Sequence, residues 1–92
     1  MIIVNKKKHD YEVDCTRGTK WGNPYIIGID GSRSEVIEKF RVYFLNKLEL
    51  GLITREELFS LNGMICGCVC KPLPCHCDVI KEILENEMRL HK

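Results

Sequence analysis

Five of the six cysteines in this chain lie in a single segment, Cys66–Asp78, together with two of the three prolines and one of the three histidines. A thiolate is both a metal ligand and a nucleophile, and an imidazole can act as a ligand or as a general base. The segment therefore suits two kinds of site, a metal centre or a reactive thiol. In a reducing compartment, six cysteines are typical of such sites or of buried thiols rather than of disulfides.

A metal centre in this segment would take its ligands from both sides of the Pro72–Pro74 turn. Zinc prefers four tetrahedral nitrogen or sulfur ligands and would staple a strand to the helix that follows, although the usual spacing is the more regular C-x2-4-C. An iron–sulfur cluster is the less favoured alternative. The candidate ligands are Cys68, Cys70 and Cys75, with His76 or Cys77 as the fourth.

The alternative is a reactive thiol at the start of a helix. A cysteine at a helix N-terminus beside a histidine has a stabilised thiolate, and the N–H groups there attract anions. The candidate catalytic residues are Cys75, His76 and Asp78. For Cys15 and Cys66 a simpler interpretation is preferred, because free cysteines most often behave as small buried apolar side chains.

A second stretch, Arg17–Pro24, has a composition that packing does not require. Glycine lets backbone amides approach a ligand, arginine grips a phosphate or carboxylate, and tryptophan stacks on a ring. If this loop lies across from the cysteine segment, the two form one composite site for a nucleotide-like or phosphorylated small molecule. The alternative is a surface loop whose tryptophan closes the edge of the core. The candidate ligand-binding residues are Arg17, Lys20, Trp21, Gly22 and Asn23.

Local signals predict the elements that must position these stretches. Short β-branched or alternating runs predict strands, and two apolar strands flanking a polar turn suggest a hairpin. Capping boxes, S-x-x-E and T-x-x-E, predict the starts of two helices, and apolar residues at helical spacing predict a third. The expected strands are Ile2–Val4 and Tyr11–Cys15, paired as the hairpin, and Met64–Cys70; the expected helices run from Ser32 to about Leu50, from Thr54 to Asn62 and over Asp78–Leu90.

These elements predict an α/β or α+β fold in one domain, residues 1–92. The expected order is β-β-α-α-β-α, with a small sheet of about three to four strands covered by three helices. In this arrangement Cys66, Cys68 and Cys70 share one face of a strand, since strand side chains alternate. The cysteines at 75 and 77 then stand at the entrance of the last helix.

The charges of the chain are nearly balanced, with 14 basic and 13 acidic residues and a formal net charge of +1. This balance argues against a nucleic-acid coat, and the basic run Lys6–His9 lacks the interleaved aromatics of a nucleic-acid site. No stretch is long and apolar enough to span a membrane, and the N-terminus has no signal-peptide pattern. We therefore expect a cytoplasmic protein with no membrane partner.

Two motifs carry a resemblance to a known family: RGTKWGNPY over residues 17–25 and GCVCKPLPCH over residues 67–76. Together they resemble DUF4326, a family of small uncharacterised proteins of bacteria and phages, over most of the chain, from about Tyr11 to Leu84. The resemblance implies no established activity; for a viral gene, host takeover or anti-defence in the host cytoplasm would suit so small a protein. The matching positions are Arg17, Lys20, Trp21, Gly22, Asn23, Pro24, Gly67, Cys68, Cys70, Pro72, Cys75, His76 and Asp78.

The chain departs from the family pattern at three of these neighbouring positions. Val69 stands where the family usually has an aromatic residue, Cys77 where it usually has glycine, and Cys66 where an aliphatic residue is common. The resemblance therefore implies that Cys15, Cys66 and Cys77 are additions of this chain. It makes Cys68, Cys70, Cys75 and His76 the better candidates for chemistry that the family shares.

Two hypotheses remain open. In the first, the chain recognises a nucleotide-like or phosphorylated small molecule, with processing of it as an option. The site would be the composite of Arg17–Pro24 and Cys68–Asp78. The second is a zinc-stapled interaction module whose partner is a protein or a nucleic acid. The residues leave open whether the chain is an enzyme.

Overall fold

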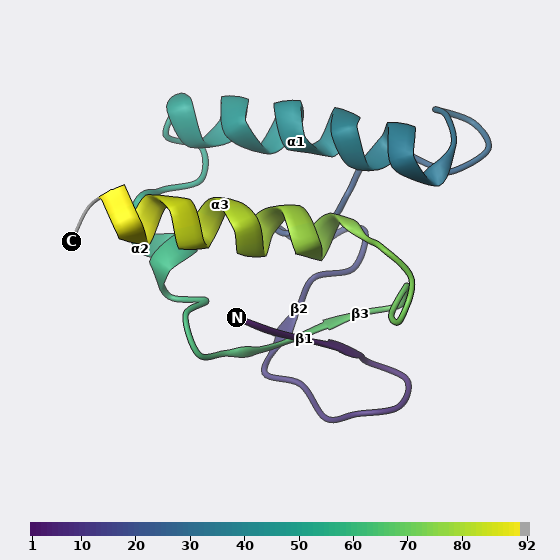
Figure 1. Cartoon of the computed structure of the whole chain (residues 1–92), viewed down its shortest axis with the longest axis horizontal. Coiled ribbons are helices and arrows are strands. Elements are labelled where there is room, and N and C mark those ends of the chain that lie inside the picture. The colour runs from purple at the N-terminus through teal and green to yellow at the C-terminus, as the bar shows by residue number, and fades with distance from the viewer. Residues whose placement is uncertain (91–92) are drawn as a thin grey trace.

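The computed structural model describes residues 1–90, which form three helices and a three-stranded sheet (Figure 1). The fold is α+β, and the order β-β-α-α-β-α agrees with the prediction. The strands are β1 (Ile2–Asn5), β2 (Val13–Asp14) and β3 (Ile65–Cys68), and the helices are α1 (Arg33–Glu49), α2 (Arg55–Phe59) and α3 (His76–Leu90).

The central strand of the sheet is β3, and both β1 and β2 pair with it in parallel. Ile3 on one side and Val13 on the other stand opposite Cys66. The predicted hairpin is therefore wrong, because β1 and β2 lie at opposite edges of the sheet. An alternating pattern identifies the two faces of a strand but not its partner. The more continuously apolar strand, β3, takes the buried centre, as parallel sheets require.

The two predicted capping boxes are present at the starts of α1 and α2. Ser32 caps α1 with Glu35, and Thr54 caps α2 with Glu57; in each pair the hydroxyl and the carboxylate both accept backbone N–H groups. Helix α2 ends at Phe59, earlier than predicted, and the chain then turns towards β3.

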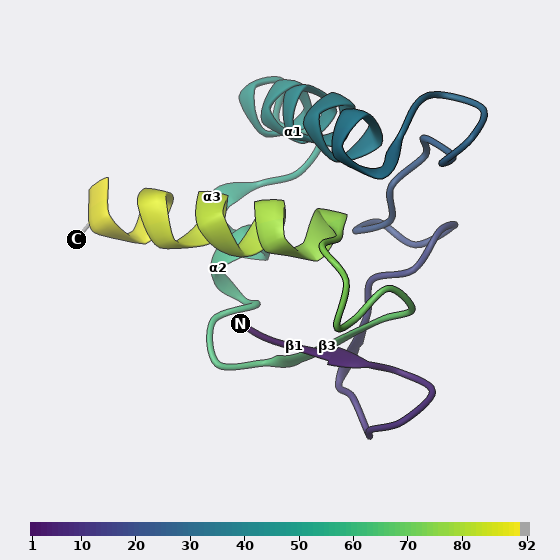
Figure 2. The same ribbon diagram turned by 45° about the vertical axis from the view of Figure 1, so that its right-hand side comes forward.

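The molecule is layered, with α3 between α1 and the sheet (Figures 1 and 2). Because α3 has neighbours on two sides, it buries a broad face. Its buried residues are His76, Cys77, Val79, Ile80, Ile83 and Leu84, and those of α1 are Val36, Phe40, Phe44 and Leu48. None of the helices in residues 1–90 has the length and apolarity needed to cross a bilayer.

Helices α1 and α3 run side by side in the same direction (Figure 2). Both begin at the end of the molecule towards which β3 runs. The connection from β3 to α3 carries the cysteine motif, and the connection from β2 to α1 carries the Arg17–Pro24 loop. The parallel topology therefore brings the two sequence motifs to the same end of the molecule.

Candidate functional site

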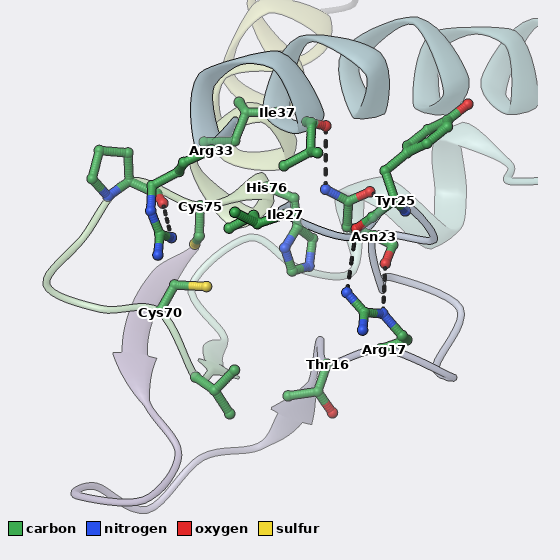
Figure 3. A pocket seen from close by; sticks show the side chains of 13 residues that line it. Thr16, Arg17, Asn23, Tyr25, Ile27, Arg33, Ile37, Cys70, Cys75 and His76 are labelled. Carbon is green, nitrogen blue, oxygen red and sulfur yellow. Dashed lines mark hydrogen bonds between the residues drawn. The ribbon is translucent and has the colours of Figure 1, made fainter. Parts of the chain in front are cut away.

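A pocket of about 270 Å³ lies at this end, between the Arg17–Pro24 loop, the start of α1 and the turn before α3 (Figure 3). We call it the Arg17 pocket. Both motifs contribute to its wall: five of the predicted site residues line it, namely Arg17, Asn23, Cys70, Cys75 and His76. The other lining residues are Thr16, Tyr25, Ile27, Arg33, Val36, Ile37, Val69 and Pro74.

Arg17 is held along its own loop by two hydrogen bonds. Its Nε donates to the carbonyl oxygen of Asn23 at 3.4 Å, and its Nη2 donates to that of Tyr25 at 3.2 Å (Figure 3). A guanidinium has five N–H donors in a planar fork. Within the described residues these two bonds leave further N–H donors of Arg17 for a ligand. The same two bonds fix the orientation of the guanidinium.

Arg33 is a second cation of the pocket that the sequence interpretation missed. It is the first residue of α1, and its Nη1 donates to the carbonyl oxygen of Pro74 at 3.0 Å (Figure 3). This bond links the start of α1 to the turn before α3. The sequence signal for Arg33 was weak, because a charged residue after an N-cap is usually part of a solvated first turn.

Asn23 shapes the wall of the pocket. Its Nδ2 donates to the carbonyl oxygen of Val36 at 3.3 Å, and its Oδ1 accepts the backbone N–H of Tyr25 at 2.9 Å. The side chain therefore ties the loop to α1 and turns the chain towards Tyr25.

The three other predicted ligand-binding residues do not line the pocket and have structural roles instead. Trp21 is only 8% exposed and packs against Phe44 with ring centroids 6.2 Å apart. Lys20 forms an ion pair with Glu57 of α2. A Cβ added to Gly22 would lie 2.4 Å from the carbonyl oxygen of Thr16, so glycine is needed there for close backbone approach.

Asp78 caps α3 and does not line the pocket. Its Oδ2 accepts the backbone N–H of Cys75 at 3.0 Å, and its Oδ1 accepts the ammonium of Lys71 at 2.6 Å. Burial would raise the pKa of Asp78, but the hydrogen bonds from Lys71 and from the Cys75 backbone outweigh it and lower that pKa. The carboxylate thus holds the helix start, and with it the neighbouring thiol, in place.

The ring of His76 is fixed in one orientation. Its Nε2 lies 2.7 Å from the carbonyl oxygen of Cys15, and the ring of Phe40 meets it edge-on with centroids 5.0 Å apart. A carbonyl only accepts, so Nε2 donates this bond and the neutral imidazole keeps its lone pair at Nδ1. While this hydrogen bond lasts, His76 can act as a base or as a ligand through Nδ1 and not through Nε2.

Three thiols form a tight buried group at the start of α3. The sulfurs of Cys68, Cys75 and Cys77 all lie within 4.8 Å of one another, and the Cys68–Cys75 distance is 3.7 Å. Three close cysteines of this kind could hold a metal ion. Of the other predicted ligands, Cys70 lies on the pocket wall and His76 beside the group, but neither belongs to it.

The environment of this group favours one thiolate. A hydrogen bond from the Cys77 thiol is the largest cause that lowers the pKa of Cys75, to about 6, and bonds from the Cys77 backbone and Cys68 add to it. The pKa of Cys77 is raised in turn by its hydrogen bonds to Cys15 and Cys75, and burial raises that of Cys68. Of these three thiols only Cys75 has a lowered pKa, and it is also the member of the group that lines the pocket.

Cys15 and Cys66 extend this sulfur cluster towards the sheet. Both are fully buried, as expected for apolar packing. The hydrogen bond from Cys66 is the largest cause that lowers the pKa of Cys15, and the bond to Cys15 raises that of Cys66. All six cysteines are free thiols.

Comparison with known proteins places the chain in a family. A family model described as "Domain of unknown function (DUF4326)" matches residues 3–86. An "Uncharacterized 12.4 kDa protein in nrdA-td intergenic region" of Enterobacteria phage T4 is 46% identical over 84 residues, which cover 91% of this chain and 77% of the relative. No solved structure matches the chain. Since the family model covers almost the whole chain and includes both motifs that line the Arg17 pocket, the chain belongs to the DUF4326 family.

Proposed function

We propose that the chain binds a small nucleotide-like or phosphorylated molecule in the Arg17 pocket. One observation carries this proposal: the two motifs, far apart in sequence, meet at one cavity, where Arg17 lies across from Cys75 and His76. A structural role alone would not require both motifs to face the same hollow. The phage T4 relative supports the host cytoplasm as the place where this site works.

The wall of the pocket suits a ligand with an anionic end and an apolar or ring-shaped part. The guanidinium groups of Arg17 and Arg33 favour a phosphate, which arginine can bind through two N–H groups. Ile27, Val36 and Ile37 supply an apolar side. The volume, about 270 Å³, is just below the roughly 300–1,000 Å³ of pockets for drug-sized ligands. A mononucleotide or a sugar phosphate is therefore a better match than a dinucleotide.

Processing of this ligand is the second part of the proposal. Cys75 and His76 both line the pocket; the pKa of Cys75 is lowered, and Nδ1 of His76 keeps a lone pair. A nucleophile and a base in one pocket are the minimum for covalent or acid–base chemistry. Asp78 acts as a positioning residue in this scheme, since it caps the helix that presents both groups.

Substitution of Arg17 is expected to weaken ligand binding. Hydrogen bonds to charged groups contribute about 1.5–3 kcal/mol, so Arg17→Gln should raise the Kd for a bound phosphate compound roughly ten- to a hundredfold. Isothermal titration calorimetry with adenosine 5′-monophosphate, ribose 5-phosphate and inorganic phosphate measures this directly.

The matched control is Arg55→Gln, which removes the same charge from α2, where Arg55 pairs with Glu87. It should leave the Kd unchanged. Arg17→Lys keeps the charge but loses the planar fork, and is expected to fall between the two. If none of the three phosphate compounds binds the wild-type protein, or if Arg55→Gln weakens binding as much as Arg17→Gln, the proposed function is wrong.

The second candidate function is a zinc-stapled interaction module, whose partner would be a protein or a nucleic acid. The three sulfurs of Cys68, Cys75 and Cys77 favour it, and we propose Zn²⁺ as the ion that they hold. Such an ion would join β3 to α3 across the cysteine motif. Sulfur ligands at this spacing suit zinc better than the harder cations magnesium and calcium.

Removal of the ion is expected to destabilise the protein. An ion present at a hundred times its Kd adds about 2.7 kcal/mol of stability, and each kcal/mol shifts the Tm of a domain of this size by roughly 4–8 °C. A strong chelator should therefore lower the Tm by about 10 °C or more in wild type and in Cys66→Ala, but not in Cys77→Ala. Native mass spectrometry should show one zinc ion before the chelator is added; an apo mass and an unchanged Tm would exclude this candidate.

A further inference from the structure

We infer that the metal site of Cys68, Cys75 and Cys77 is an open, three-thiolate site, and that the occupant of the Arg17 pocket supplies the fourth donor atom to the ion. This inference rests on the proposed function of the pocket and on the second candidate, which it joins into one site. The ligand class that follows is a phosphorylated molecule with a phosphate oxygen or a ring nitrogen free to coordinate.

The spacing of the sulfurs is that of a coordination shell. A Zn–S bond of about 2.3 Å places neighbouring sulfurs of a tetrahedron about 3.8 Å apart. The Cys68 and Cys75 sulfurs are 3.7 Å apart, and the Cys77 sulfur lies within 4.8 Å of both. One edge of the shell is therefore already at the required length, and the two edges to Cys77 need a contraction of at most about 1 Å to close around an ion.

Residues 1–90 provide no fourth ligand at this distance. No other cysteine, histidine, aspartate or glutamate among them places a ligand atom within 4.8 Å of all three sulfurs. Two neighbours approach the Cys77 sulfur alone. Cys15 forms a hydrogen bond with it but lies outside the group of three, and Nε2 of His76 lies 3.8 Å from it but donates its proton to the carbonyl oxygen of Cys15. Asp78 is held by Lys71 and by the Cys75 backbone.

Three protein ligands with one open position distinguish zinc sites that bind exogenous molecules from closed structural ones. Here the open position has a route to the pocket, because Cys75 belongs to the sulfur group and to the pocket wall. Figure 3 shows Cys75, Cys70 and His76 among the side chains that line the pocket. The other two ligands, Cys68 and Cys77, do not line it.

The charges support an anionic donor that is anchored elsewhere. A divalent ion with three thiolates carries a net charge of −1, so a further anion binds it only where other cations compensate. Arg17 and Arg33 both line the pocket and provide them. A phosphorylated ligand can then bind the two guanidinium groups and the ion together.

The test uses cobalt in place of zinc, because the absorption of Co²⁺ reports its ligands. The intensity of the sulfur-to-cobalt charge-transfer band counts thiolates, and the visible d–d bands respond to the fourth donor. Full-length wild type is loaded with Co²⁺, and adenosine 5′-monophosphate is added. We expect a three-thiolate spectrum whose d–d bands shift and saturate at the concentration at which calorimetry shows the pocket to fill.

Two variants separate the pocket from the ion. Arg17→Gln should keep the three-thiolate spectrum but need at least about tenfold more adenosine 5′-monophosphate for the shift. Cys66→Ala, a thiol outside the group, should behave as wild type. A four-thiolate spectrum, or d–d bands that stay unchanged when calorimetry shows the pocket filled, overturns the inference and leaves the proposed function intact. Calorimetry that shows no binding of any of the three phosphate compounds overturns the proposed function itself.

Discussion

In the metal-free protein, the reactivity of Cys75 towards iodoacetamide is expected to rise through a midpoint at about pH 6. An ordinary cysteine thiol has its midpoint near 9.0. The shift has a structural cause, since the Cys77 thiol donates to the Cys75 sulfur and the backbone and Cys68 add further hydrogen bonds. The thiolate form is therefore lost as the pH falls through 6, rather than through 9.

The midpoint is a better readout than the rate at one pH. At pH 7 a thiol with a pKa of 6 is about nine-tenths thiolate, against about one part in a hundred for a pKa of 9. The intrinsic nucleophilicity of a thiolate falls with its pKa, with a Brønsted coefficient of about 0.4–0.5. The two effects nearly offset each other, so the rate at pH 7 rises only a few-fold while the midpoint moves by about three pH units.

Two substitutions at one position test the cause. Cys77→Ala removes the main hydrogen-bond donor and should move the midpoint of Cys75 back towards 9, whereas Cys77→Ser keeps a donor and should retain most of the shift. Fragment-ion mass spectrometry assigns the label to Cys75 apart from Cys70, which also lines the pocket. A wild-type midpoint near 9 would contradict the assignment of the thiolate to Cys75.

The proposed pocket and the proposed metal site differ in how widely they should occur. Arg17, Asn23, Cys75 and His76 all match the family motifs, so the pocket should be shared by relatives. The resemblance described above implies that Cys77 replaces a usual glycine, and its sulfur is one of the three that would hold the ion. We therefore expect the ion to be a property of this chain and its close relatives, and the pocket to be shared more widely.

The helices could be predicted from the sequence because their signals are local. The capping boxes at Ser32 and Thr54 depend on residues three positions apart, and the structure has both. The pairing of β1 and β2 with β3 could not be predicted in this way. Strand partners are chosen by long-range burial, and nothing in Ile2–Asn5 or Val13–Asp14 marks a parallel neighbour more than fifty residues away.

The same contrast between local signals and long-range contacts applies to the site. Composition marked the Arg17 loop as a candidate site, since arginine and glycine in an aperiodic loop suggest a ligand. That the loop lies across from Cys75 and His76 was only a hypothesis at the sequence level, and in the structure all three residues line one pocket. The inward packing of Trp21 and the ion pair of Lys20 with Glu57 depend on where α1 and α2 lie. The place of Cys77 in the sulfur group depends on the exact first turn of α3, which begins at His76 rather than Asp78.

The second large effect is expected from Phe40, which joins the core to the site. Its side chain is 1% exposed, and its ring lies 5.6 Å from that of Phe44 and 5.0 Å from that of His76. Phe40→Ala should cost about 3–5 kcal/mol through lost burial and the cavity left behind. This is a large share of the roughly 5–15 kcal/mol that stabilises a typical domain, so urea unfolding should show a much lower midpoint.

The matched control is Val42→Ala on the exposed side of the same helix, where the valine is 60% exposed. It should change the free energy of unfolding by less than about 0.5 kcal/mol. Because the ring of Phe40 also supports the imidazole of His76, the more conservative Phe40→Leu is expected to weaken binding of adenosine 5′-monophosphate while the protein remains folded. Equal unfolding midpoints for Phe40→Ala and Val42→Ala would contradict the packing of α1 against α3, and with it the position of His76 on the pocket wall.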